Sequence, residues 1–118
     1  MEFTIDFLQV FVYVLYRASP LLLTSLFIII LLGQIVGKKE NWTWFDSLYW
    51  SFITSTTVGY GDIKPIGKIS KTLAVFIAFS GLIFTGIVVA LAFYSVTEVI
   101  QSRQDFQVLR NTIDTIAK

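Results

Sequence analysis

The segment from residue 69 to residue 99 limits the possible folds of this chain more than any other feature. Between Lys71 and Glu98 it contains no charged residue, and its only polar members are serine, threonine, glycine and one tyrosine. A helix needs about 20 apolar residues to cross the hydrocarbon core of a bilayer. At about 1.5 Å per residue this segment is longer than the core, so we expect a membrane-spanning helix that tilts or projects beyond the bilayer.

A second apolar segment, residues 19–37, is also long enough to span a membrane. We interpret Ser19 as its helix cap and Pro20 as its first helical residue, a position where proline is well tolerated. Residues 38–40 (Lys, Lys, Glu) end the segment. The chain therefore has two predicted spans.

Residues 1–18 are rich in Phe and Tyr, but Thr4, Asp6 and Gln9 interrupt their apolar run. They lack the basic leader and the cleavage site of a signal peptide. We interpret them as an N-terminal interfacial helix that joins the first span at a kink. The sequence leaves open the alternative that they extend the first span by several turns.

The composition supports a membrane protein and excludes other classes. The chain has 118 residues, room for one domain at most, and 55% of them are hydrophobic against 14% charged. A soluble chain this small cannot bury so much apolar surface. A net charge of +1 gives no support for a nucleic-acid partner. The absence of cysteine and histidine removes disulfides and the commonest metal ligands.

Residues 43–56, between the spans, have the pattern of a short amphipathic helix. Thr43 followed by Asp46 resembles a helix start, and nearby tryptophans suit the headgroup level. Such a helix reaches about 20 Å, which is too short to cross the membrane. It enters part of the way, so the next segment must bring the chain back.

Residues 57–62, TVGYGD, are that returning segment. Non-helical backbone at membrane depth is tolerated only where it is buried in protein or lines a water-filled path. Gly59 and Gly61 permit dihedral angles that are closed to residues with a Cβ atom. Alternating left- and right-handed conformations can direct successive carbonyl oxygens the same way, with Val58 and Tyr60 packed outward. Rings of such carbonyls from several chains can replace the water shell of a cation.

The sequence TTVGYGD, residues 56–62, resembles the selectivity filter of potassium channels. The order of span, half-helix, filter and span is similar to the pore module of that family. The resemblance implies an all-α membrane protein in which two transmembrane helices flank a re-entrant pore helix and a filter, assembled as a tetramer. The pore domain would cover residues 19–99, with the pore helix at 43–56, the filter at 57–61 and the second span at 69–99.

The same resemblance implies a passive K⁺ channel rather than an enzyme. It assigns the K⁺ sites to the backbone carbonyls of Thr57, Val58, Gly59 and Tyr60, with the Thr57 hydroxyl at the inner end. Gly61 would complete the outer mouth. K⁺ is then the permeant ion, and no organic cofactor is expected.

Four residues around the motif match positions that support the filter in the family. Trp50 is expected to support Tyr60 from outside, and the Tyr49 hydroxyl to reach Asp62. Ordinary packing or interface anchoring is the alternative for both aromatic residues. In the proton-gated bacterial prototype a Glu stands at the position of Ile53 and pairs with the Asp after the filter. Ile53 cannot form that pair, so we expect a weaker tendency of the filter to collapse.

The second span carries the predicted gate. Gly81 matches the inner-helix hinge of the family, with close helix packing as the alternative, whereas close packing is expected at Gly86. Phe93 is a candidate hydrophobic gate that closes by dewetting. Glu98 would form a ring of charge at the inner mouth, or would only be solvated at a helix end. The expected cavity-lining positions are Leu82, Thr85, Val89 and Ala90.

Residues 100–118 are predicted to form a cytoplasmic amphipathic helix. A 3-4 spacing of apolar residues and one serine indicates either a helical bundle or a solvated tail with incidental periodicity. The members of this pattern are Val99, Ser102, Phe106, Leu109, Ile113 and Ile116.

The resemblance also implies the topology and partners. Basic residues are nearly balanced between the two sides and give no positive-inside signal. Since the family's filter opens outward, we expect a plasma-membrane protein with both termini in the cytoplasm. The expected partners are the other copies of a homotetramer and the lipid bilayer. A regulatory domain or subunit at the C-terminus is a further expectation. The rival classes are K⁺ uptake transporters, which resemble four such units in one chain, a non-conducting accessory subunit and a weakly selective cation channel.

Overall fold

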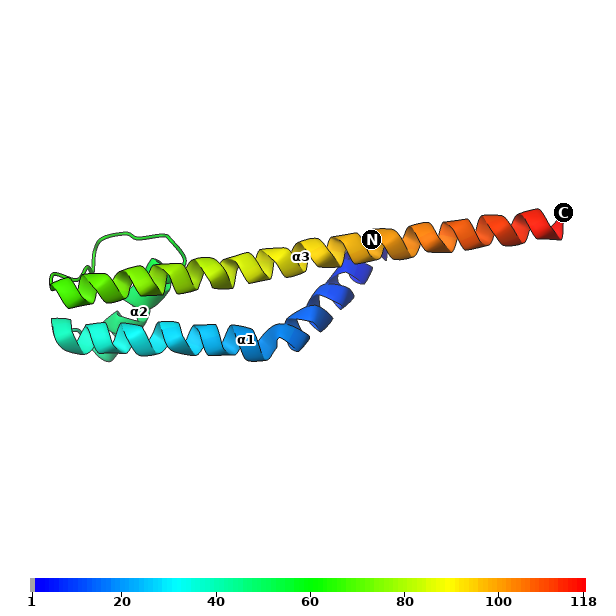
Figure 1. The fold of residues 1–118 in the computed structure, drawn as a ribbon. Coiled ribbons are helices and arrows are strands. Elements are labelled where there is room, and N and C mark those ends of the chain that lie inside the picture. Colours follow the sequence, from blue (N-terminus) through cyan, green and yellow to red (C-terminus); the bar gives the residue numbers. More distant parts are fainter. Residues whose placement is uncertain (1) are drawn as a thin grey trace. The chain divides into compact units, whose positions relative to one another are not determined.

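The computed structural model describes residues 2–118 and contains three helices in that range. They are α1 (Glu2–Glu40), α2 (Trp44–Ser55) and α3 (Lys68–Ala117), in the predicted order of long, short and long helix (Figure 1). α1 and α3 are each long and apolar enough to cross a membrane. The chain divides into two compact units. We call residues 19–87 the α2 unit, and the residues up to 18 together with those from 88 onward the terminal unit.

α1 passes through the position where the sequence indicated the start of the first span. Ser19 and Pro20 both lie inside the helix, so their interpretation as cap and first helical residue was wrong. A proline removes one N–H from the helix ladder, but membrane helices tolerate it because neighbouring groups satisfy the freed backbone. Residues 2–18 thus continue the first helix, as in the alternative interpretation. Their position relative to a membrane stays a prediction.

A tight turn joins α1 to α2. Asn41 adopts a left-handed conformation with φ of 61°, and the Trp42 N–H donates to the Gly37 carbonyl at 2.9 Å. This is the usual way for a helix to satisfy its last carbonyls. The Thr43 hydroxyl then accepts the Asp46 N–H at 3.1 Å and caps α2, which confirms the predicted helix start. Twelve helical residues reach about 18 Å, too short to span a bilayer.

A row of three serines packs α2 into its unit. Ser47, Ser51 and Ser55 recur every fourth residue, and none is more than 5% exposed. A Cβ atom added to Gly33 of α1 would lie 1.6 Å from the Ser51 Oγ, and one added to Gly37 would lie 1.8 Å from the Ser47 Oγ. The Ser47 and Ser51 hydroxyls donate to carbonyls four residues earlier. Small residues on both helices therefore let their backbones approach closely.

An apolar cluster joins the three helical parts of the α2 unit. Ile29 and Val36 of α1, Trp50 of α2 and Ile77 of α3 are at most 5% exposed and pack together. The Trp42 and Trp50 rings pack edge-on, with their centroids 5.2 Å apart. Such a pair contributes about 0.5–1.5 kcal/mol beyond the burial of its area. This cluster fixes α2 against both long helices.

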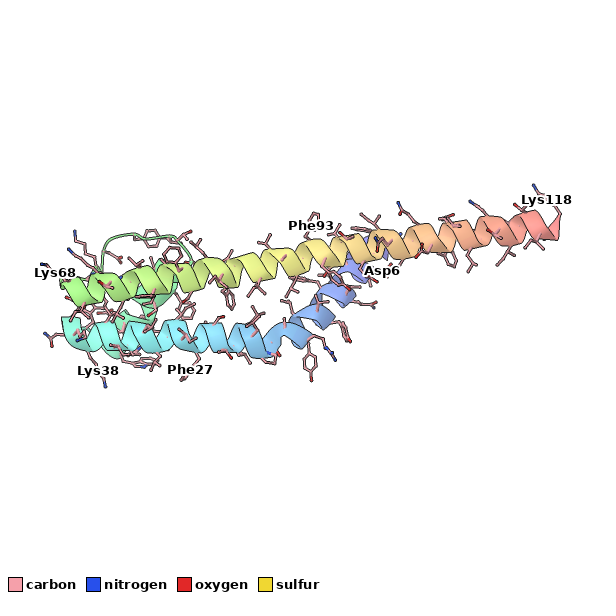
Figure 2. The ribbon with its side chains drawn as sticks, in the orientation of Figure 1. Asp6, Phe27, Lys38, Lys68, Phe93 and Lys118 are labelled. Carbon is pink, nitrogen blue, oxygen red and sulfur yellow. The ribbon has the colours of Figure 1, made fainter. Side chains whose placement is uncertain are left out.

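The charged residues of the α2 unit are confined to one part of its sequence. They fall between Lys38 and Lys71, where α1 ends and α3 begins, and Figure 2 labels Lys38 and Lys68 there. The remaining stretches, 19–37 and 72–87, are uncharged and expose large apolar side chains such as Phe27 and Phe79. Because a charge at the bilayer centre is costly, this arrangement favours a lipid-embedded unit whose charged end lies at the membrane surface.

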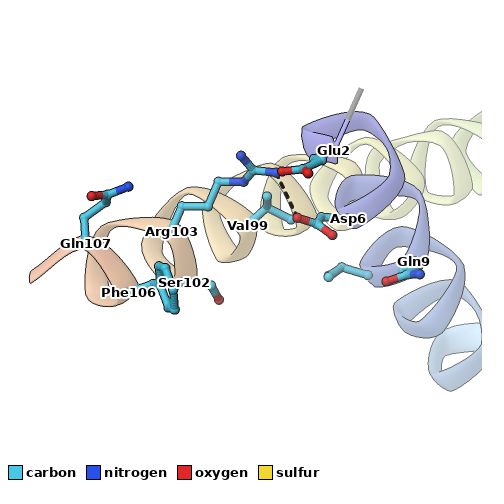
Figure 3. A pocket seen from close by; sticks show the side chains of 9 residues that line it. Glu2, Asp6, Gln9, Val99, Ser102, Arg103, Phe106 and Gln107 are labelled. Carbon is cyan, nitrogen blue, oxygen red and sulfur yellow. Dashed lines mark hydrogen bonds and ion pairs between the residues drawn. The ribbon is translucent and has the colours of Figure 1, made fainter. Parts of the chain in front are cut away.

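In the terminal unit, Arg103 of α3 connects to the first turns of α1. Its guanidinium donates to the Asp6 carboxylate at 2.9 Å (Figure 3). The same guanidinium lies 5.7 Å from the centre of the Phe3 ring. Exposed ion pairs contribute only about 0–1 kcal/mol. The contact nevertheless ties residues that are 97 positions apart.

Candidate functional site

The loop between α2 and α3 has a backbone whose handedness alternates along the TVGYG motif. φ is 67° at Thr57, 56° at Gly59 and 79° at Gly61, whereas Val58 and Tyr60 do not have positive φ. The two glycines predicted this alternation. Thr57 was not predicted to join it, because a β-branched residue is rarely left-handed and such a conformation costs of order 1–3 kcal/mol. Strain of this kind clusters at functional sites.

Two backbone hydrogen bonds hold the beginning of the motif against the end of α2. The Thr57 N–H donates to the Thr54 carbonyl at 3.2 Å, and the Gly59 N–H donates to the Ile53 carbonyl at 3.1 Å. Ile53 thus contributes its backbone to the loop. Its side chain is half-buried and apolar, so it offers Asp62 no partner for a carboxyl pair.

Tyr49 links α2 to the residue that follows the motif. Its hydroxyl donates to the Asp62 carboxylate at 2.9 Å, the contact anticipated from the sequence. This hydrogen bond, with the charge of Asp62, raises the pKa of Tyr49 above its ordinary value. The hydroxyl therefore stays protonated and remains a donor throughout the physiological pH range. The bond joins α2, which precedes the motif, to Asp62, which follows it. It can therefore limit how far the motif moves from α2.

Trp50 has a different environment from the one expected. It is 5% exposed, inside the apolar cluster with Ile29, Val36 and Ile77. Tyr60 is 70% exposed, and within residues 2–118 no ring pair joins it to Trp50. In the single chain Trp50 thus has a packing role, which was the alternative interpretation. A role in supporting Tyr60 stays a prediction for an assembled protein.

Glu40 holds the loop that leads from the motif to α3, and sequence reasoning missed it. Its Oε1 accepts the Gly67 N–H at 2.9 Å and the Ile66 N–H at 3.1 Å. The Gly67 N–H above all, with help from the Ser70 hydroxyl, holds the pKa of Glu40 below its ordinary value. Glu40 is therefore a charged acceptor at neutral pH. The only sequence signal was a lone carboxylate beside two lysines at the end of a span, and nothing pointed to partners 26 residues later.

The structure assigns close packing to Gly81 rather than to Gly86. A Cβ atom on Gly81 would lie 2.0 Å from the Ser55 carbonyl oxygen, at the C-terminal end of α2. Gly86 has no such neighbour within 4 Å in this chain. Close packing at Gly86 is therefore absent within this chain and stays a prediction for contacts between copies, and a hinge at Gly81 also stays a prediction.

The positions expected to line a cavity on α3 are free of contacts that would bury them. Phe93, the candidate gate, is 75% exposed, and Glu98 is half-buried. A 3-4 spacing places the cavity positions close to one face of the helix. The exposed members of this set are Leu82, Thr85, Val89 and Ala90.

Comparisons with known proteins indicate the family of this chain. A family model described as "Ion channel" matches residues 3–98. TWiK family of potassium channels protein 7 of Caenorhabditis elegans is 58% identical over 33 residues, which are 28% of this chain and 6% of that protein. Two-pore potassium channel 1 of Arabidopsis thaliana is 36% identical over 73 residues, 62% of this chain and 20% of that protein.

A prokaryotic relative is also similar. The voltage-gated potassium channel of Aeropyrum pernix is 42% identical over 38 residues, 32% of this chain and 13% of that protein. The chain spans a fifth or less of the length of these three relatives. No solved structure matches it significantly.

Proposed function

Because the chain belongs to the ion-channel family whose model covers residues 3–98, we propose that it forms a K⁺-selective channel pore as a homotetramer. The family makes it an integral membrane channel rather than an enzyme. The names of the similar proteins, all potassium channels, support K⁺ as the permeant ion. The observation that carries the proposal is the alternating handedness at Thr57, Gly59 and Gly61, in a loop between two helices of membrane-spanning length.

The proposed selectivity depends on backbone carbonyls. With alternate residues left-handed, successive peptide carbonyls can be directed to one side of the strand, toward a shared axis. K⁺ exchanges its hydration shell for the carbonyls of Thr57, Val58, Gly59 and Tyr60, and the Thr57 hydroxyl completes the inner end. Na⁺ gains less from the same oxygens, through cavity size, the number and field strength of the carbonyls, or both.

Four copies are needed because one strand offers oxygens from one side only. The exposed face of α3 supports this assembly, since it leaves the cavity positions available to the axis. Glu98 then forms a ring of four charges near the inner mouth, which raises the local K⁺ concentration. We place both termini in the cytoplasm of a cell whose plasma membrane holds the channel, with the C-terminus available to a regulatory domain or subunit.

The decisive experiment is reconstitution of the purified protein in liposomes with K⁺ or Na⁺ gradients. We expect flux of K⁺ well above that of Na⁺, and none in protein-free liposomes. Equal flux of both ions rejects the selectivity, and no flux of either ion from tetrameric protein rejects the channel in favour of an accessory subunit.

Tyr49→Phe is expected to make the K⁺ current decline several-fold faster during sustained opening. The change removes only the hydroxyl that donates to Asp62, so the ring packing remains while the motif loses one of its ties to α2. Recordings in planar bilayers measure the decay time. Tyr13→Phe, at an exposed tyrosine of α1, is the matched control and should leave the decay unchanged. An unaltered decay in Tyr49→Phe contradicts the supporting role.

Phe93→Ala is expected to raise the basal K⁺ leak several-fold. Four exposed Phe93 rings would form a hydrophobic constriction that closes by dewetting. Alanine leaves the constriction wide enough to stay filled with water. Liposome flux without a gating stimulus measures the leak. Phe76→Ala, at an exposed phenylalanine on another face of α3, is the control. If both variants leak as little as the parent, the gate lies elsewhere.

A further inference from the structure

Past residue 99, α3 continues as a helix, and every residue from Gln101 to Lys118 is exposed. A solitary helix of this length is marginal in water, because most helical stability in proteins comes from packing an amphipathic face. This segment has such a face, with residues at the a and d positions of a heptad repeat. They are Val99, Ser102, Phe106, Leu109, Ile113 and Ile116.

The chain itself covers only the beginning of this face. Val99 is 4% exposed and lines a groove with Asp6 and Val10 of α1, beside the ion pair of Arg103 (Figure 3). Phe106 lies at the edge of the same groove and is mostly exposed, and beyond it nothing in residues 2–118 covers the face. We call these later apolar residues the free seam. Their exposed fractions are 62% for Phe106, 59% for Leu109, 57% for Ile113 and 79% for Ile116.

The charges beside the seam match those of a parallel coiled coil. With Val99 at position a, Glu98 and Asp105 occupy g positions, and Arg103 and Arg110 occupy e positions. In a parallel coiled coil a g residue faces the e residue of the next heptad on the neighbouring helix, so acid meets base at both places. An antiparallel arrangement would bring e against e, which is arginine against arginine.

We propose that the free seam binds the same seam in the other copies of this chain, as a parallel coiled coil in which Asp105 pairs with Arg110 of a neighbouring copy. Because Arg103 already forms an ion pair with Asp6, the Asp105–Arg110 pair determines the register between neighbouring helices. This inference rests on the proposed homotetramer, because the pore supplies the number of copies. The pore also holds four segments at high effective concentration, which offsets the shortness of the seam.

The chain contains no cysteine, so single cysteines can report which faces of the helices approach. Leu109→Cys places a thiol in the free seam, and Thr115→Cys places one on the outer face as a matched control. The full chain in lipid nanodiscs is oxidised with copper phenanthroline and run on a non-reducing gel. We expect about tenfold more disulfide-linked dimer from Leu109→Cys, because a disulfide requires Cβ atoms about 3.5–4.5 Å apart.

A charge exchange tests the direction of the helices in the Leu109→Cys background. Asp105→Arg should reduce cross-linking, and adding Arg110→Asp should restore it. Native mass and K⁺ flux are measured on the same samples. Equal cross-linking of both cysteines in tetrameric, conducting protein overturns the coiled coil and leaves the proposed function standing. Monomeric protein without K⁺ flux overturns both, and unrestored cross-linking in the double exchange overturns the parallel pairing.

Discussion

Gly81→Ala is expected to prevent most of the protein from assembling as a tetramer. The new Cβ atom would lie 2.0 Å from the Ser55 carbonyl oxygen and 2.6 Å from the Ser55 carbonyl carbon and Cα. These are backbone atoms that cannot rotate away, so α2 must shift off α3. Overpacking costs about 1–3 kcal/mol per site, occasionally more. In a tetramer each of the four copies would have this cost. The measurements are the tetramer fraction in detergent by native mass and the midpoint of thermal unfolding.

Gly86→Ala is the matched control, on the same helix but with no neighbour within 4 Å of its added Cβ. Alanine is favoured over glycine in a helix by about 1 kcal/mol, so this variant should be as stable as the parent or more so. The pair also separates two roles of Gly81. If Gly81 is only a hinge, Gly81→Ala should stay fully tetrameric and change the open probability alone, and that result contradicts the packing role.

The three helices could be predicted because their signals are local. Membrane-length apolar runs and the Thr43 cap need only neighbouring residues to be interpreted, and the structure has helices at each place. The alternation at Gly59 and Gly61 was likewise predictable, because the glycine spacing indicates which residues can adopt positive φ without a steric penalty. The predicted start of the first span was wrong for a related reason. Pro20 is a good first residue of a helix, but a membrane helix can also pass through it.

Contacts between distant residues could not be predicted in the same way. Glu40 meets Gly67 across 27 positions, and Gly81 meets Ser55 across 26, and no local pattern encodes either partner. The left-handed Thr57 goes against its own intrinsic preference and is held by its surroundings. The serine row of α2 had a usable signal. Serines at every fourth position of a helix rich in large apolar residues indicate a small-residue packing face.

Gly59→Ala is expected to lower the ratio of K⁺ to Na⁺ permeability toward that of an unselective pore. Gly59 has φ of 56°, where an L-residue costs about 1–2 kcal/mol, and four copies would make that about 4–8 kcal/mol if the costs add. No atom lies within 4 Å of the added Cβ, so the cost is conformational rather than steric in this chain. The backbone can relieve it by turning its peptide planes, which moves carbonyls off the axis. Reversal potentials in mixed K⁺ and Na⁺ solutions measure the ratio.

Val58→Ala is the control for that substitution, because it shortens a neighbouring side chain at a residue without positive φ. It should keep the selectivity of the parent while removing some packing behind the motif. Both variants retain Tyr49 and Asp62, so the tie between α2 and the loop is the same in each. Since the backbone, and not the side chain, is the proposed ligand, only the change that disturbs φ should alter ion choice. Gly59→Ala protein that conducts with the permeability ratio of the parent contradicts the carbonyl site.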